Sequence, residues 1–282
     1  MTQPTLGEVV DLVHTWYPPA TAEGWDAVGL VAGDPAEPVR RILVALDPVA
    51  AVVDEALAWD ADLVLTHHPL LLRGVHAVTA DDPKGAIVHR LVRGGCALLA
   101  SHTNADVAES GVAEALAELL GLRDVRPVVP DAEGATGAGR MGELPAPLTL
   151  RDLAAHAAAV LPPTPQGVRV AGDLDALVRT IAVLPGSDDT RFAEAAAAGA
   201  DVYVSSDLKH HPVSEQRERA RLGDGRPFVL DTAHWASESP WLRVVAARLT
   251  AELAARGHDV EVRVSEQRTD PWTARVASPG FP

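Results

Sequence analysis

The sequence predicts an α/β protein of two interlinked α/β domains with mainly parallel sheets flanked by helices. Short runs rich in Val, Leu and Ile alternate with segments of helical periodicity, the pattern of strands joined by crossover helices. A stretch rich in Pro and Gly, residues 128–149, separates two such blocks and is the best candidate for a domain crossing. With 282 residues and 47% hydrophobic side chains, the chain can build cores for two ordinary domains.

The first block opens with a helical pattern at residues 5–17, which Pro18 and Pro19 close. Alternation of strand and helix patterns follows. The expected elements are strands at 28–33, 41–47, 62–66 and 96–100, and helices at 48–60 with Pro in the first turn, 83–95 closed by glycine, and 111–121. This order predicts parallel neighbours in one sheet.

The second block repeats this alternation after residue 149. The expected elements are helices at 150–161, 190–200, 210–222 and 241–257, and strands at 167–172, 180–186, 201–205, 227–231 and 259–265. The tail at 267–282 has no clear periodicity, and we expect it to be irregular.

Composition excludes several classes of protein. No stretch approaches the roughly 18 apolar residues of a membrane span, and the N-terminus lacks the features of a signal peptide, so a cytoplasmic protein without membrane attachment is expected. The formal charge of −15 opposes nucleic-acid binding. The single cysteine, Cys96, cannot form an internal disulfide and is expected to be a small buried hydrophobe.

Three apolar strands lead directly into polar clusters. "DLVLT" is followed by His67 and His68, "CALLA" by "SHTNAD" ending at Asp106, and "PFVLD" by "TAHWASE" carrying His234 and Glu238. The carboxyl ends of parallel strands share one edge of a sheet, where ligands bind, so these clusters can converge. If a helix starts near His234, Glu238 lies four residues on and shares its face.

These residue types indicate metal chemistry. Neutral imidazole suits zinc, iron or manganese, and carboxylates can bridge two cations. Three His, one Asp and one Glu exceed the roughly three protein ligands of an open single-zinc site, which favours two divalent metal ions per chain. Adjacent residues on an extended chain point in different directions, which also argues against one mononuclear site for His67 and His68.

Simpler explanations exist for individual residues. A single His at the end of a strand is usually structural or exposed. Asp106 could be the N-cap of the helix that follows, and Glu238 could be a first-turn charge that favours a helix dipole. The joint occurrence after three strands is harder to explain in this way.

Several motifs, in order, resemble the Ngg-interacting-factor-like family, often labelled GTP cyclohydrolase 1 type 2. They span about Glu23 to Glu238. They are "EGWDAVGLVAGD", "THHPLLLRG", "SHTNADVAESGV", "GAGRMGEL", "IAVLPGS", "DVYVSSDLKHH" and "TAHWASE". "HHP" is weak alone, but "THHPL" followed by "SHTNxD" and a late "HxxxE" is a specific combination.

The resemblance implies a dinuclear metal site with ligands at His67, His68, Asp106, His234 and Glu238, and a homo-oligomer, since many members form toroidal hexamers. It also implies that the C-terminal segment returns to the first domain. We therefore expect a discontinuous metal-site domain at 1–127 and 226–282, and a second domain at 128–225. Ala27, Ala233 and the Ser205-Ser206 pair depart from the family pattern, which affects the pocket and not the proposed ligands.

The resulting hypothesis is a metal-dependent hydrolase in which an activated water attacks an electrophilic centre. The family label implies opening of the GTP ring with loss of formate, and a nucleotide or phosphoester substrate would use the same chemistry. His211 or Glu238 could transfer protons. The alternative is a metal-binding assembly or interaction scaffold without turnover.

Two further segments could contribute to a site. Asp207, Lys209 and His211 in "SSDLKHH" could contact ligands or substrate, although a solvated helix start explains them better. "LPGSDD" could present N–H groups to a phosphate, but its two acidic residues oppose this.

Overall fold

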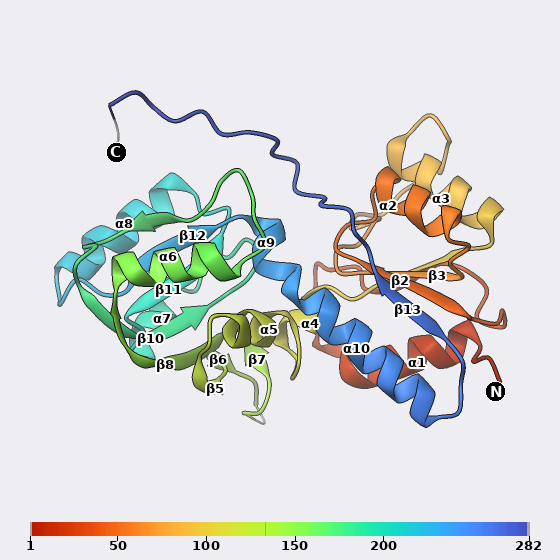
Figure 1. Ribbon diagram of the computed structural model, residues 1–282, viewed down its shortest axis with the longest axis horizontal. Helices are drawn as coiled ribbons and strands as arrows, with labels where there is room; N and C mark the ends of the chain where they lie inside the picture. Colours follow the sequence, from red (N-terminus) through yellow and green to blue (C-terminus); the bar gives the residue numbers. More distant parts are fainter. Residues whose placement is uncertain (1, 133, 281–282) are drawn as a thin grey trace. The chain divides into compact units, whose positions relative to one another are not determined.

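The computed structural model describes residues 2–132 and 134–280, which form two compact units. Unit 1 falls within Met1–Gly111 and Trp241–Thr269, and unit 2 within Val112–Pro240 and Asp270–Pro282. Each unit contains a sheet flanked by helices, so the predicted α/β class is confirmed (Figure 1). None of the helices in the described ranges has the length and apolar character to cross a membrane.

Unit 1 is built on a five-stranded sheet of order β1-β4-β3-β2-β13. The three pairings along β4-β3-β2-β13 are parallel, and β1, at the other edge, runs antiparallel to β4. The elements are α1 (Leu6–Trp16), the 3₁₀ turn η1 (Pro19–Thr21), β1 (Gly29–Ala32), β2 (Arg41–Ala45), α2 (Ala50–Ala58), β3 (Leu63–Thr66), α3 (Pro83–Gly94), β4 (Ala97–Ala100), α4 (Thr103–Val107), α10 (Pro240–Ala255) and β13 (Glu261–Val264).

Helices cover both faces of this sheet, which explains why its strands read as continuous apolar runs. On one face α2 and α3 pack through Val52, Val53 and Leu91 onto the strands. Figure 1 shows α1 and α10 on the other face, where Leu6, Val9, Val245 and Leu249 are buried. Cys96 is 3% exposed within the first of these cores, as predicted.

Unit 2 is built on a six-stranded sheet of order β5-β8-β10-β11-β12-β9. Only its centre, β10-β11-β12, is parallel, and antiparallel strands flank it on both sides. The elements are α5 (Val112–Leu119), β5 (Arg123–Arg126), β6 (Val129–Pro130), β7 (Gly137–Ala138), β8 (Arg140–Thr149), α6 (Leu150–Val160), β9 (Arg169–Ala171), β10 (Leu177–Val183), α7 (Phe192–Ala197), β11 (Val202–Ser206), α8 (His210–Arg221), β12 (Phe228–Thr232) and α9 (His234–Glu238).

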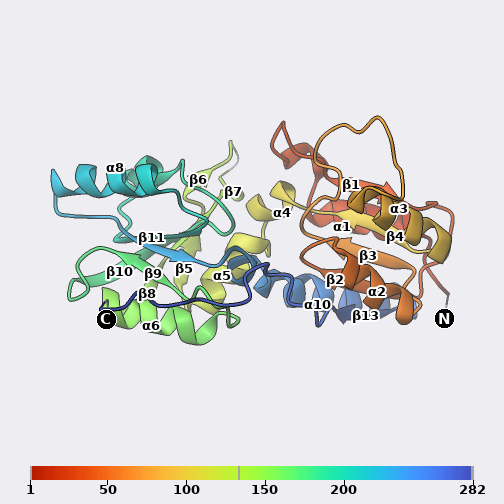
Figure 2. The same ribbon diagram turned by 90° about the horizontal axis from the view of Figure 1, so that it is seen from above.

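Alternate residues of these strands pack into two separate hydrophobic cores. Val202 and Val204 face a core with α5, α6 and α9, whereas Tyr203 faces a core with α7 and α8. Figure 2 shows α8 and α6 on opposite sides of the strands. The two layers hold the strands in register, so the ends of β11 and β12 are fixed relative to each other.

The division into units differs from the predicted boundaries at 127/128 and 225/226. Residues 112–127 and 226–240 lie in unit 2, because β5 and β12 pair into its sheet. The stretch at 128–149, expected to cross between domains, forms β6, β7 and the long β8 inside unit 2. A return of the C-terminal part of the chain to the N-terminal unit is present, over residues 241–269.

The strand registers place the polar clusters at sheet edges. In unit 1, Thr66 pairs with Ala100 and Ala45 with Thr66, so the residues that follow β2, β3 and β4 leave the same edge. In unit 2, Ser206 pairs with Thr232, so the residues that follow β11 and β12 also leave together. Each unit therefore carries one cluster of polar side chains at the carboxyl ends of its parallel strands.

Candidate functional site

Three imidazoles of unit 1 converge beyond the carboxyl ends of β3 and β4. His67, His68 and His102 place ligand nitrogens within 4.8 Å of one another, and their ring centroids are 5.0–5.5 Å apart. His67 is fully buried, whereas the other two are partly buried. The group has the residue types and the spacing of a metal site.

The convergence of His67 and His68 corrects the expectation that neighbours on an extended chain would point apart. β3 ends at Thr66, and both histidines lie in a bend rather than in the strand. The Thr66 hydroxyl donates to the carbonyl oxygen of His68 at 2.8 Å and stabilises this bend. The alternation of side chains along a strand therefore no longer applies to the pair.

Each of these three imidazole rings has a hydrogen-bond partner at its Nδ1 atom. Nδ1 of His67 donates to the carbonyl oxygen of Ser101 at 3.0 Å, which leaves the lone pair on Nε2. Nδ1 of His68 lies 2.6 Å from Oδ1 of Asp47, and Nδ1 of His102 lies 2.8 Å from Oδ1 of Asp26. Such partners fix the orientation and tautomer of metal-binding histidines.

Asp26 is held firmly in its ionised form. Burial alone would raise the pKa of this carboxyl, but hydrogen bonds from His102 and from Thr103 outweigh it, and the pKa lies well below its ordinary value. The Thr103 backbone N–H donates to Oδ2 at 3.0 Å and the Thr103 hydroxyl donates at 2.5 Å. An ionised Asp26 can therefore orient the His102 ring at any physiological pH.

Asp106 lies beside His67 in the same unit. Oδ1 of Asp106 is 3.6 Å from Nε2 of His67. Two ligands bound at about 2.1 Å in tetrahedral geometry lie about 3.4 Å apart, so this separation fits a shared ion. Asp106 lies inside α4, and α5 begins only at Val112, so the N-cap alternative is wrong.

Unit 2 brings His234 and Glu238 together on α9, as the predicted spacing of four residues requires. Nε2 of His234 is 3.1 Å from Oε2 of Glu238, whose side chain is 4% exposed. Glu238 is the last residue of α9, so it is not a first-turn charge at a helix N-terminus, and that alternative is wrong. This carboxylate lies among protein atoms and faces the imidazole.

The third member of this set is Asp207, directly after β11. Oδ2 of Asp207 accepts a hydrogen bond from Nδ1 of His234 at 2.8 Å, and this bond lowers the pKa of Asp207. Burial opposes protonation of the imidazole, yet the carboxylates of Glu238 and Asp207 prevail and raise the pKa of His234 to about 11. Asp207 has φ 51°, a left-handed conformation that Asp tolerates better than most non-glycine residues.

Small residues shape the surroundings of Glu238. Gly186 has φ +71°, and a Cβ placed there would lie 2.4 Å from Oε1 of Glu238. The hydroxyl of Ser237 accepts from the Gly186 N–H at 3.0 Å and also bonds Ser206 Oγ at 3.1 Å. These bonds tie α9 to the ends of β10 and β11, so the carboxylate has a fixed position in unit 2.

Other predicted residues lie elsewhere. His211 is exposed in the first turn of α8, and its ring contacts His210 at a centroid distance of 5.1 Å. Lys209 forms an ion pair with Asp189 at 2.8 Å. In "LPGSDD" the Asp188 side chain itself accepts from the N–H groups of residues 190 and 191, so these donors are not presented to a phosphate.

Sequence reasoning missed His102, Asp26 and Asp47 as members of the unit 1 set. His102 stands in "SHTNAD", and Asp47 follows β2 just as the histidines follow β3. The rule that selected the other residues, a polar side chain directly after an apolar strand, could have found both. Asp26 follows no parallel strand, and only the packing of its loop against residues 102–103 reveals its role.

Comparisons with known proteins show the family of this chain. A family model described as Duf34/NIF3 (NGG1p interacting factor 3) matches residues 4–271. A Streptomyces coelicolor relative named GTP cyclohydrolase 1 type 2 homolog is 51% identical over 278 residues, covering 98% of this chain and 96% of its own length. A Clostridium perfringens relative of the same name is 33% identical over 272 residues, covering 95% and 98%.

Solved structures show the same fold. A Bacillus cereus protein related to NIF3 has a TM-score of 0.88 at 25% identity, covering 97% of this chain and 100% of that chain. A Staphylococcus aureus protein has a TM-score of 0.87 at 27% identity, covering 96% and 100%. The likeness extends over both units.

Proposed function

Because the chain belongs to the Duf34/NIF3 family, we propose that it is a metal-dependent hydrolase that acts on a small molecule. The observation that carries this proposal is the convergence of three imidazoles, each held at Nδ1 by a partner. Imidazole nitrogens with carboxylate oxygens are ligands suited to Zn²⁺, Mn²⁺ or Fe²⁺.

We propose His67, His68, Asp106, His234 and Glu238 as the ligands of two divalent ions, with His102 as a further candidate. The resemblance of the sequence motifs is our reason to propose that these residues of the two units bind the same pair of ions. Bound ions would supply Lewis acidity and lower the pKa of water toward neutrality. Asp26, Asp47 and Asp207 would orient the imidazoles.

Glu238 is our candidate for proton transfer. Its carboxylate is buried and held 3.1 Å from His234 Nε2, so it has a defined position from which to accept a proton from an attacking water. The exposed His211 remains a second candidate for that role. The name GTP cyclohydrolase 1 type 2 homolog suggests GTP as substrate, with ring opening and release of formate, and other nucleotides or phosphoesters would use the same groups.

The first test is the metal content of protein purified without chelator. We expect two divalent ions per chain in the wild type and a strong loss in Asp106→Ala. Glu109→Ala is the matched control, because it removes an exposed carboxylate three residues away. Equal metal content in Asp106→Ala and Glu109→Ala would show that Asp106 is not a ligand.

The second test is a metal-reconstituted activity screen over nucleotides and phosphoesters, with products identified by mass spectrometry. We expect turnover that chelation abolishes and added Zn²⁺, Mn²⁺ or Fe²⁺ restores. We also propose a homo-oligomer, a hexamer by family resemblance, which sedimentation can test. No turnover by fully metallated protein, together with dissociation of the oligomer when metal is removed, would favour the scaffold alternative.

A further inference from the structure

Unit 2 contains a pocket of about 1000 Å³ that is lined in part by its edge strand β9. Three segments line it: residues 165–174 around β9, residues 207–208 after β11, and residues 272–275 of the C-terminal tail. The volume lies at the upper end of the roughly 300–1,000 Å³ typical of small-molecule sites. The tail, irregular as predicted, thus forms one wall of a cavity.

The walls of this pocket are largely apolar. Val168, Val170, Leu174 and Leu208 line it together with Trp272, whose side chain is 63% exposed. An exposed indole leaves its apolar surface in water, which is unfavourable. Covering that flat surface with a ligand would therefore be favourable. The lining therefore suits a molecule with an aromatic or aliphatic body.

One cation of the pocket carries a charge that no carboxylate offsets. Arg169 forms an ion pair with Asp231, its register partner on β12. Arg275 donates only to the backbone carbonyl oxygen of Gln166, at 3.4 Å, and within residues 2–132 and 134–280 it pairs with no carboxylate. In a chain of net charge −15, such a group is a specific point of attraction for an anion.

Asp207 also lines the pocket, but its carboxylate is occupied by the hydrogen bond from His234 Nδ1 at 2.8 Å. We propose that this pocket binds a small organic anion, with Arg275 holding the anionic group and Trp272 covering the apolar body. Because Asp207 is a carboxylate in the same lining, the apolar body of the ligand and not its anionic group must face the residue that orients His234. Its assignment as the substrate rests on the proposed function, whereas its binding does not.

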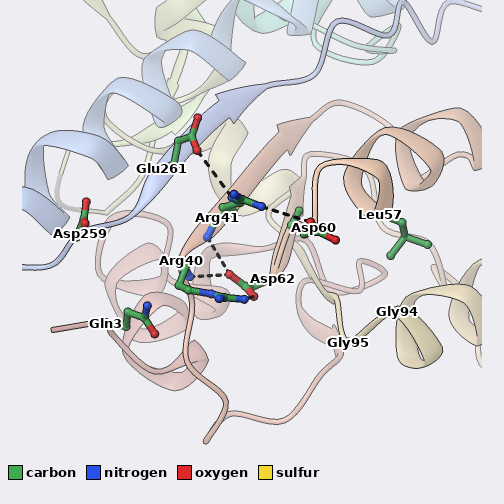
Figure 3. Close-up of a pocket in the computed structure, with 11 residues that line it drawn as sticks. Gln3, Arg40, Arg41, Leu57, Asp60, Asp62, Gly94, Gly95, Asp259 and Glu261 are labelled. Atoms are coloured by element: carbon green, nitrogen blue, oxygen red, sulfur yellow. Dashed lines mark hydrogen bonds and ion pairs between the residues drawn. The ribbon is translucent and has the colours of Figure 1, made fainter.

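A pocket in unit 1 provides a contrast. It measures about 760 Å³ and is lined by arginine and carboxylate side chains. Its arginines already form ion pairs with these carboxylates (Figure 3). Arg40 pairs with Asp62 at 3.3 Å, and Arg41 pairs with Asp60 at 3.6 Å and Glu261 at 3.8 Å. It lies at the amino ends of the strands, and its paired charges leave no cation for a ligand.

The test uses 1-naphthalenesulfonate and phenylphosphonate, two aryl anions that a hydrolase cannot cleave at an ester bond. Calorimetric titration of the full chain is expected to show one site per chain for at least one of them. Arg275→Ala should weaken binding at least tenfold and Trp272→Ala at least fivefold. Arg268→Ala and Val276→Ala, exposed tail positions outside the pocket lining, should stay within twofold.

Two further measurements locate the binding. Hydrogen exchange should slow in residues 166–172 and 272–275 when the anion is added, and binding should persist after chelation. Equal affinity in Arg275→Ala and Arg268→Ala, no binding of either anion, or binding lost on chelation would each overturn the proposal. If the anion binds in the pocket but no metal or turnover is found, the proposed hydrolase fails while this site stands.

Discussion

Gly186→Ala tests the geometry around His234 and Glu238 without replacing either of these proposed ligands. The added Cβ would lie 2.4 Å from Glu238 Oε1, whereas ordinary contacts of this kind begin near 3.4 Å, so the carboxylate must retreat by about 1 Å. Binding sites tolerate displacements of only about 0.5 Å. We therefore expect metal affinity to fall about 10–100-fold, or roughly 1.4–2.7 kcal/mol.

The same substitution also strains the backbone, because Gly186 has φ +71°. A non-glycine residue in this region costs about 1–2 kcal/mol of folding free energy. Gly199→Ala is the matched control: Gly199 has φ +87°, but a Cβ there meets nothing within 4 Å. In chemical denaturation Gly199→Ala should show the backbone cost alone, and Gly186→Ala should lose at least as much stability because its Cβ also displaces Glu238.

Metal affinity, measured by calorimetric titration of chelator-treated protein, separates the two variants. We expect Gly199→Ala to bind like the wild type and Gly186→Ala to bind weakly. Indistinguishable affinities of the two variants would refute the argument that the position of the Glu238 carboxylate matters for binding.

Three other predictions follow from the same structure. Asp47→Asn should weaken metal binding about 10–100-fold while the fold is retained, because the His68 ring loses its charged partner; unchanged affinity by calorimetry would contradict this. Glu238→Gln should lose turnover far more than thermal stability, and an unaltered rate constant at full metal occupancy would exclude Glu238 from proton transfer. Burial raises the pKa of the Cys96 thiol to about 12, so a disulfide reagent should leave the native chain unmodified from pH 7 to 10 and label it once after unfolding. Because the folded pKa is raised, this group's contribution to stability is complete below about pH 9 and declines as the pH rises toward 12.

Local patterns in the sequence predict the residues that follow strands. Apolar runs such as residues 62–66 and 227–231 mark buried strands, and the residues after them must leave the sheet at its carboxyl edge. The spacing of His234 and Glu238 likewise fixes their shared helix face, independently of the rest of the chain. These relations depend only on local geometry, so the sequence is enough to infer them.

Relations set by tertiary packing could not be inferred in this way. Asp26 meets His102 across 76 positions of the chain, and no periodicity encodes that contact. Strand β8 contains Pro145 and Pro147, which favour a loop in a sequence pattern. Its register with β10 shifts between Val178 and Thr180, opposite these prolines, so the sheet tolerates their missing N–H groups.

The position of β13 in its sheet has a consequence for biosynthesis. β13 is the edge partner of β2, yet roughly 200 residues separate the two strands. A ribosome adding about 5–20 residues per second needs about 10–40 s to supply the missing strand. During that interval Ile42, Leu43 and Val44 present an apolar strand with an open edge, a template for intermolecular pairing. Removing the chain from β13 onward is therefore expected to leave this edge open and to lower the yield of soluble protein, which expression of the shortened chain can measure.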